Sequence, residues 1–185
     1  MDQLLDTIRT ERLSLREWDE GDLDALHDTY RHEEVTRYLG AFKPDATMDD
    51  TRARLARYRG LCTGDFGVWA VVPDEVGHPV GSVILLPLHE NDGTDSGEVE
   101  IGWHLNPTAW GNGYATEGAR PLLDRAWALG IDQVWAIVDP RNPDSMRVAL
   151  RLGMQPEGRT ERWFNKETEV FLATQGLATR NQTSP

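Results

Sequence analysis

The sequence holds a single cysteine, Cys62, so no disulfide can form within the chain. Its five histidines are scattered, without the H-E-x-x-H spacing of a catalytic zinc site, and we therefore expect no metal. No apolar run approaches the roughly 18 residues that a membrane span needs. The first residues also lack the basic and apolar regions of a secretory signal, so we expect a cytoplasmic protein with no membrane partner.

Basic residues are in short supply as well. The chain has 19 lysines and arginines against 31 aspartates and glutamates, a formal net charge of −12. A field of this sign repels phosphate backbones, which argues against nucleic acid as the main partner. It favours a cationic substrate such as an amine, although the same charge would serve solubility equally well.

The length and composition predict one globular domain. The chain has 185 residues, of which 39% are hydrophobic and 27% are charged, and it is long enough to bury a core. No repeat and no linker interrupts it. We expect a single domain over residues 1–175 and a flexible tail over residues 176–185.

Hydrophobic periodicity predicts how the elements follow one another. Alternation of apolar residues predicts strands, and apolar residues three or four apart predict helices. The predicted strands are residues 12–17, 67–72, 79–88, 98–105, 132–139, 159–164 and 169–175. The predicted helices are residues 18–30, 47–61, 113–129 and 143–153. Hairpin-linked strands come first and helical crossovers follow, which predicts an α/β chain of α+β type with a mixed, mostly antiparallel sheet of about six to seven strands and helices on both faces.

A glycine-rich turn stands directly before the third predicted helix. In "NPTAWGNGYATEG", Gly111 and Gly113 remove side chains at alternate positions and Ala115 keeps the next one small. A helix start exposes unpaired N–H groups at the positive end of the helix dipole, so an anion can approach a bare backbone there. The pattern predicts a pyrophosphate site. A tight, closely packed turn would explain the same glycines, and neither a Walker loop nor a dinucleotide fingerprint fits.

This stretch resembles the acyl-CoA loop of the GNAT N-acyltransferases. The similarity continues through "ERLSLREWDEGDL", "EVEIGWHLNP" and "NPDSMRVALRLGM", which follow the order of the RimJ/RimL-type branch over about residues 10–175. One departure is Trp110, which stands where the family often has Arg or Gln. The resemblance implies the GNAT fold with a central splay in its sheet, acetyl-CoA as acyl donor, and an amine acceptor that is a protein N-terminus or a small molecule.

The resemblance also implies a set of residues that contact acetyl-CoA. Backbone groups of the glycine turn would bind the pyrophosphate, backbone groups of the preceding strand and Asn142 would bind the pantetheine amides, and Arg147 would meet the 3′-phosphate. Asn142 and Ser145 would otherwise serve only as helix-capping residues, and Arg147 would otherwise belong to a solvated helix face. The expected contact residues are Trp103, Leu105, Trp110, Gly111, Asn112, Gly113, Tyr114, Ala115, Thr116, Asn142, Ser145 and Arg147.

Acyl transfer to an amine needs a base, because most amines are protonated at neutral pH. Glu100 is the candidate, since it lies on the strand face opposite the apolar stripe and at the family's "E-I-G" position; its alternative role is an ion pair with an arginine. Glu98 and His104 share that face and are reserve candidates. A free strand N–H near Gly102 or Trp103 would polarise the carbonyl.

The group that donates to the departing thiolate is expected to be Ser145 or a water molecule. Many relatives have a tyrosine four residues further on, where this chain has Ala149. The leading interpretation is an N-acetyltransferase that works by direct attack in a ternary complex. The alternatives are a non-catalytic module that senses acyl-CoA and an acyltransferase with a longer donor such as succinyl-CoA. The chain would be a monomer or a homodimer.

Overall fold

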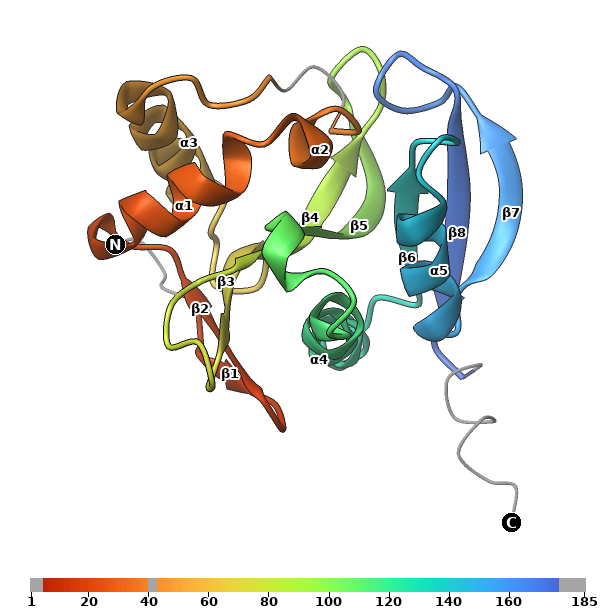
Figure 1. Cartoon of the computed structure of the whole chain (residues 1–185). Helices are drawn as coiled ribbons and strands as arrows, with labels where there is room; N and C mark the ends of the chain where they lie inside the picture. The colour runs from red at the N-terminus through yellow and green to blue at the C-terminus, as the bar shows by residue number, and fades with distance from the viewer. Residues whose placement is uncertain (1–4, 40–42, 177–185) are drawn as a thin grey trace.

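The computed structural model describes residues 5–39 and 43–176, in which eight strands form one sheet (Figure 1). The order across the sheet is β1-β2-β3-β4-β5-β6-β8-β7. The strands are β1 (Ile8–Arg9), β2 (Leu13–Glu17), β3 (Gly67–Pro73), β4 (Gly81–His89), β5 (Asp95–Leu105), β6 (Gln133–Val138), β7 (Gln155–Thr160) and β8 (Thr168–Thr174). The strand that the sequence does not predict is β1, because two residues are too few to show an alternation. The expected tail lies, apart from Gly176, outside the described residues.

The four predicted helices are present, with differences of a few residues in their bounds, and the structure has a further short helix, α2 (Glu33–Thr36), that the sequence does not predict. The helices are α1 (Leu23–Tyr30), α2, α3 (Met48–Gly60), α4 (Tyr114–Ala128) and α5 (Pro143–Arg151), with single 3₁₀ turns at Glu20–Asp22 and Pro107–Ala109. The predicted helix of residues 18–30 begins later, because Asp19 and Asp22 form a capping box around the first 3₁₀ turn. In α3 the predicted cap is confirmed: Thr47 accepts from the Asp50 N–H, and Asp50 accepts from the Thr47 N–H at 2.8 Å.

Helices cover both faces of the sheet, as predicted (Figure 1). Helices α1 to α3 cover one face through a core that includes Trp18, Tyr30 and Leu55. Helices α4 and α5 lie on the other face, over a larger core. Strand β5 divides its residues between the two, with Val99, Ile101, Trp103 and Leu105 on the α4 side and Glu98, Glu100 and His104 toward α1–α3.

The sheet opens in its middle. Strands β4 and β5 pair antiparallel without interruption from Gly81↔Leu105 to Leu88↔Glu98. Strands β5 and β6 pair in parallel at only two positions, Val99↔Val134 and Glu100↔Trp135. In the described part of the chain, β5 has no strand partner on that side beyond Glu100, and Figure 1 shows the two ribbons diverging. This divergence is the central splay that the sequence resemblance implies.

The last hairpin corrects one prediction. The strand expected at residues 159–164 is wrong in its bounds, because β7 ends at Thr160 and the next residues form the turn to β8. Phe164 and Asn165 have φ values of 61° and 51° there, which no strand residue adopts. Trp163 is 2% exposed and packs with Leu88 and Val170. Its apolar character therefore reflects a buried turn and not a strand.

Candidate active site

The edge of β5 that faces the splay carries backbone groups without a strand partner. The Asn106 N–H donates to the Val80 carbonyl at 2.8 Å, so even-numbered positions direct their backbone groups to β4. Odd-numbered positions then direct theirs to the β6 side, which places the backbone of Trp103 and Leu105 at the open gap, as the expected pantetheine contacts require. One of these groups is already used, because the Trp110 indole N–H donates to the Leu105 carbonyl at 2.8 Å.

The glycine turn is a bare helix start. Gly111 and Gly113 have φ values of 81° and 82°, a left-handed backbone that favours glycine. Gly113 is the N-cap of α4 and offers no side-chain acceptor, and a Cβ built on Gly111 would meet nothing within 4 Å. The first N–H groups of α4 are thus left without a cap among the described residues.

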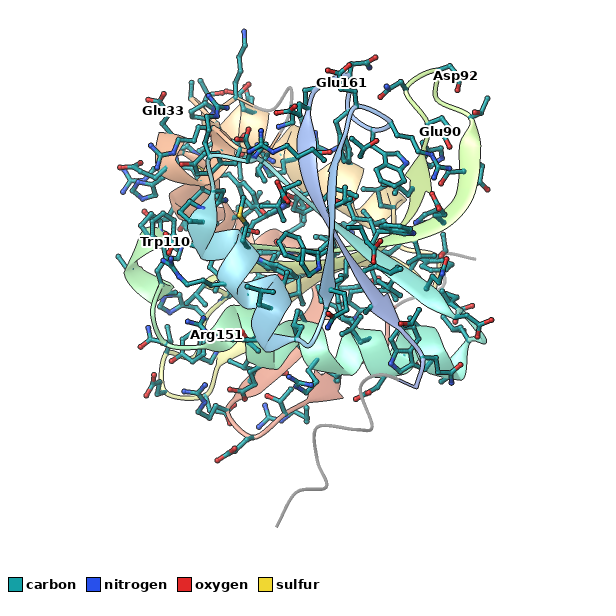
Figure 2. The ribbon with its side chains drawn as sticks, turned by 90° about the vertical axis from the view of Figure 1, so that its right-hand side faces the viewer. Glu33, Glu90, Asp92, Trp110, Arg151 and Glu161 are labelled. Atoms are coloured by element: carbon teal, nitrogen blue, oxygen red, sulfur yellow. The ribbon has the colours of Figure 1, made fainter. Side chains whose placement is uncertain are left out.

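Two further features of this turn suit an anionic group. The Thr116 hydroxyl in the first turn of α4 is buried and has no hydrogen-bond partner in the described chain. Figure 2 shows Trp110, which is 47% exposed, on the opposite side of the molecule from Glu90 and Asp92, so the turn lies away from those carboxylates. Open N–H groups, missing side chains and an unused hydroxyl together fit the pyrophosphate of coenzyme A.

Glu100 lies where the two-position seam between β5 and β6 ends. Burial raises the pKa of its carboxyl to about 8. Among the described residues no side chain donates to it or forms an ion pair with it, so the arginine partner considered from sequence is absent there. Its register partners are Leu86 on β4 and Trp135 on β6, and both side chains lie on its face of the sheet. Glu100 is half-buried, and its apolar neighbours shield the carboxyl from part of the solvent, which suits a general base.

The reserve candidates are less suited to that role. Glu98 forms an ion pair with Arg162 at 2.9 Å, and Arg162 also holds Glu90. The pKa of His104 is lowered to about 4, first by burial and then by the charges of Arg54 and Arg57, so its imidazole is neutral and weakly basic. Its Nδ1 lies 3.2 Å from the hydroxyl of Tyr30, which is itself buried.

The start of α5 faces the gap from the other side. Asn142 caps the helix, since its Oδ1 accepts from the Ser145 N–H at 3.1 Å. The Trp103 indole N–H crosses the gap and donates to the Ser145 Oγ at 3.1 Å. Because an indole can only donate, the proton of the Ser145 hydroxyl stays available for another acceptor. Sequence reasoning missed this contact, since nothing in a strand pattern shows which helix a side chain reaches.

Arg147 and Ala149 lie further along α5, one exposed and one buried. Arg147 forms an ion pair with Asp144 on the exposed face of α5, three residues away. Ala149 is fully buried, and the chain places no tyrosine there. Among the residues that the structure describes, no group of three or more His, Cys, Asp and Glu side chains could hold a metal, and no helix is long and apolar enough to cross a membrane.

Comparison with known proteins identifies the family. The profile described as "Acetyltransferase (GNAT) domain" matches residues 12–155. The uncharacterized N-acetyltransferase p20 of Bacillus licheniformis is 27% identical over 156 residues, which are 83% of this chain and 85% of that protein. The fold matches an acetyltransferase of the GNAT family from Bacillus anthracis with a TM-score of 0.75 at 23% identity, covering 91% of this chain and 98% of the other. It also matches AAC(6')-Ib in complex with ribostamycin and coenzyme A, with a TM-score of 0.72 at 16% identity over 95% and 100% of the two chains.

Proposed function

The chain belongs to the GNAT acetyltransferase domain family, and on that premise we propose that it transfers the acetyl group of acetyl-CoA to a primary amine by direct attack in a ternary complex. The observation that carries this proposal is Glu100, a desolvated carboxyl without an ion-pair partner among the described residues, at the point where the sheet opens. A carboxyl with a pKa near 8 accepts a proton from an ammonium group far better than an ordinary glutamate does.

The residues around the splay are suited to hold acetyl-CoA, which supplies the thioester when bound. The N–H groups from Gly111 to Thr116 would bind the pyrophosphate, and Trp110, Asn112, Tyr114 and Ala115 would shape that turn. The backbone of Trp103 would pair with pantetheine, with Leu105 and Asn142 beside it. The same fold binds coenzyme A in AAC(6')-Ib, which supports this assignment. Arg147 would reach the 3′-phosphate only by leaving Asp144.

Three groups of the chain would carry the chemistry. Glu100 takes the proton of the amine, directly or through water. The backbone N–H of Trp103, on the open edge of β5, donates to the carbonyl oxygen of the thioester as negative charge develops on that oxygen. Ser145 donates a hydrogen bond from its hydroxyl to the departing sulfur and so stabilises the thiolate as the C–S bond breaks. Its Oγ is held by the Trp103 indole at 3.1 Å, so that proton is free to point elsewhere. Many relatives use a tyrosine at the position of Ala149 for this step, and here Ser145 would serve instead.

The acceptor is either a protein N-terminus, as in a RimJ/RimL-like enzyme, or a small amine in the cytoplasm, and the protein acts as a monomer or a homodimer. Release of free thiol from acetyl-CoA should be measured across peptide N-termini, polyamines, amino sugars and amino acids, and repeated with succinyl-CoA. We expect turnover with one acceptor class and with acetyl-CoA. Tight binding of coenzyme A without thiol release for any amine would favour an acyl-CoA-sensing module. Turnover with succinyl-CoA alone would favour a longer donor.

A further inference from the structure

Arg12 connects the start of the chain to the glycine turn. It lies just before β2, and its guanidinium donates to the Asn112 carbonyl at 3.1 Å, a residue 100 positions away in sequence. The same guanidinium lies 5.1 Å from the centre of the Tyr114 ring, at the first position of α4. A Cβ on Gly113 would stand 3.5 Å from it. One side chain therefore contacts Asn112 and Tyr114 and lies beside Gly113 between them.

Glu117 holds Arg12 in this place. Its carboxylate accepts from the Arg12 backbone N–H at 2.9 Å, from the Arg12 Nε at 2.8 Å and from the Thr10 hydroxyl at 2.6 Å. Glu117 lies in the first turn of α4, where its negative charge would repel a phosphate bound at the helix start. The ion pair with Arg12, at 2.6 Å, offsets that charge.

The geometry of the peptide bond lets these contacts set the direction of the Gly113 N–H. The peptide between Asn112 and Gly113 is planar and trans, so its carbonyl and its N–H point in opposite directions. Because the Asn112 carbonyl is bound to Arg12, the N–H of Gly113 points away from Arg12. Gly113 has a left-handed backbone and no side chain. Its own carbonyl accepts from the Glu117 N–H at 3.0 Å, and the bond from Arg12 restrains the peptide on the Asn112 side.

We propose that Arg12 is a positioning residue for the coenzyme A site. Through Asn112 and Glu117 it fixes the peptide whose N–H, that of Gly113, binds the pyrophosphate together with the neighbouring N–H groups of the turn, and it does not touch the ligand itself. The proposal rests on the proposed function, since it assumes that the glycine turn binds coenzyme A. It makes the N-terminal hairpin part of the binding site, although that hairpin lies 105 residues from Glu117 in sequence.

The test compares two donors. Acetyl-pantetheine carries the thioester but lacks the pyrophosphate, so kcat/KM for acetyl-CoA reports on the turn and kcat/KM for acetyl-pantetheine does not. Arg12→Gln should weaken coenzyme A binding in calorimetry, and lower kcat/KM for acetyl-CoA, by about 10-fold, the effect of one charge-assisted hydrogen bond. It should leave acetyl-pantetheine unchanged. Arg9→Gln is the matched control, because Arg9 lies on the same hairpin and its side chain pairs with Asp74, with no bond to the glycine turn among the described residues.

A double-mutant cycle separates positioning from direct contact. Glu117→Gln should weaken coenzyme A binding as well, and the double variant should lose little more than either single one, because both act through one network. Coenzyme A affinity that is unchanged or higher in Glu117→Gln would overturn the proposal, as would an equal loss with both donors in Arg12→Gln. If the wild-type protein binds coenzyme A but releases no thiol, the proposed catalysis fails while the calorimetric cycle still tests Arg12. Thermal melts without ligand show that each variant is folded.

Discussion

At the start of α3, Thr47 and Asp50 satisfy each other's backbone N–H groups, whereas α4 begins at Gly113 without a side-chain cap. The same contrast separates two glutamates on one face of β5. Glu98 is bound to Arg162, while Glu100, two residues further on, has neither an ion pair nor a hydrogen-bond donor among the described residues. A folded chain usually satisfies its own polar groups. Glu100 and the uncapped start of α4 are two places where the described residues leave polar groups unmatched beside the splay of the sheet, and we expect a bound substrate to complete them.

The largest expected effect separates the two glutamates. Glu100→Gln should lower kcat by roughly 10² to 10⁴, the range for loss of a general base, with little change in affinity for acetyl-CoA. Glu98→Gln breaks a partly exposed ion pair with Arg162 and should change kcat less than about threefold. Steady-state kinetics on both variants measures the contrast. Equal losses in the two would mean that neither carboxylate is the base.

A second pair of variants separates the two ends of α4. Gly111→Ala adds a methyl group that meets no protein atom within 4 Å, so a loss of coenzyme A affinity comes either from the ligand side or from the strain of an alanine with a left-handed backbone. We expect a loss of roughly tenfold or more, measured by calorimetry. Gly130→Ala, past the other end of the helix, has a similar φ of 78° and the same open surroundings. It should cost similar stability and leave affinity unchanged; a matching loss of affinity there would point to backbone strain as the cause.

The raised pKa of Glu100 predicts two opposite pH trends. Activity needs the Glu100 carboxylate, so kcat/KM for the acceptor should rise with pH up to about 8. Above that pH the contribution of Glu100 to the profile should be constant. Stability should fall over the interval between the ordinary glutamate pKa and about 8, because the folded state holds a proton that the unfolded chain releases. Glu100→Gln should therefore melt higher than wild type at pH 9 and coincide with it at pH 4. A wild-type profile with its acid limb near pH 4 would contradict the raised pKa.

The smallest effect concerns the capped helix. Thr47→Ala removes the side-chain oxygen that accepts from the Asp50 N–H at 3.2 Å. We expect a loss of about 1 kcal/mol in the free energy of unfolding, measured by urea denaturation. Coenzyme A affinity should not change, because α3 packs on the face opposite α4. A change in affinity would show that the two helix starts are not independent.

Features that depend on neighbouring residues could be predicted from the sequence. The capping box of α3, the two faces of β5 and the bare start of α4 all follow from spacing within a few residues. The splay and the candidate residues came from the resemblance of four motifs to a family, which the family match supports. The RimJ/RimL branch stays a prediction.

Features that join distant parts of the chain could not be predicted. The bond from Trp103 to Ser145 spans 42 residues, and the ion pair of Arg12 with Glu117 spans 105. Neither has a local period that a pattern could show. The turn around Trp163 resembles a strand in the sequence for a related reason, since an apolar residue buried by tertiary packing looks like part of a strand.

The short seam between β5 and β6 has a mechanical consequence. The block formed by β1–β5 and the block formed by β6–β8 share only two register pairs across the sheet, so this seam is where we expect the native protein to open first. A ligand lying in the splay would contact both blocks and stabilise their association. At a ligand concentration of 100 times its Kd, such binding adds about 2.7 kcal/mol to the free energy of unfolding. The supply of coenzyme A in the cell would then govern how long the protein survives proteolysis as well as how fast it works.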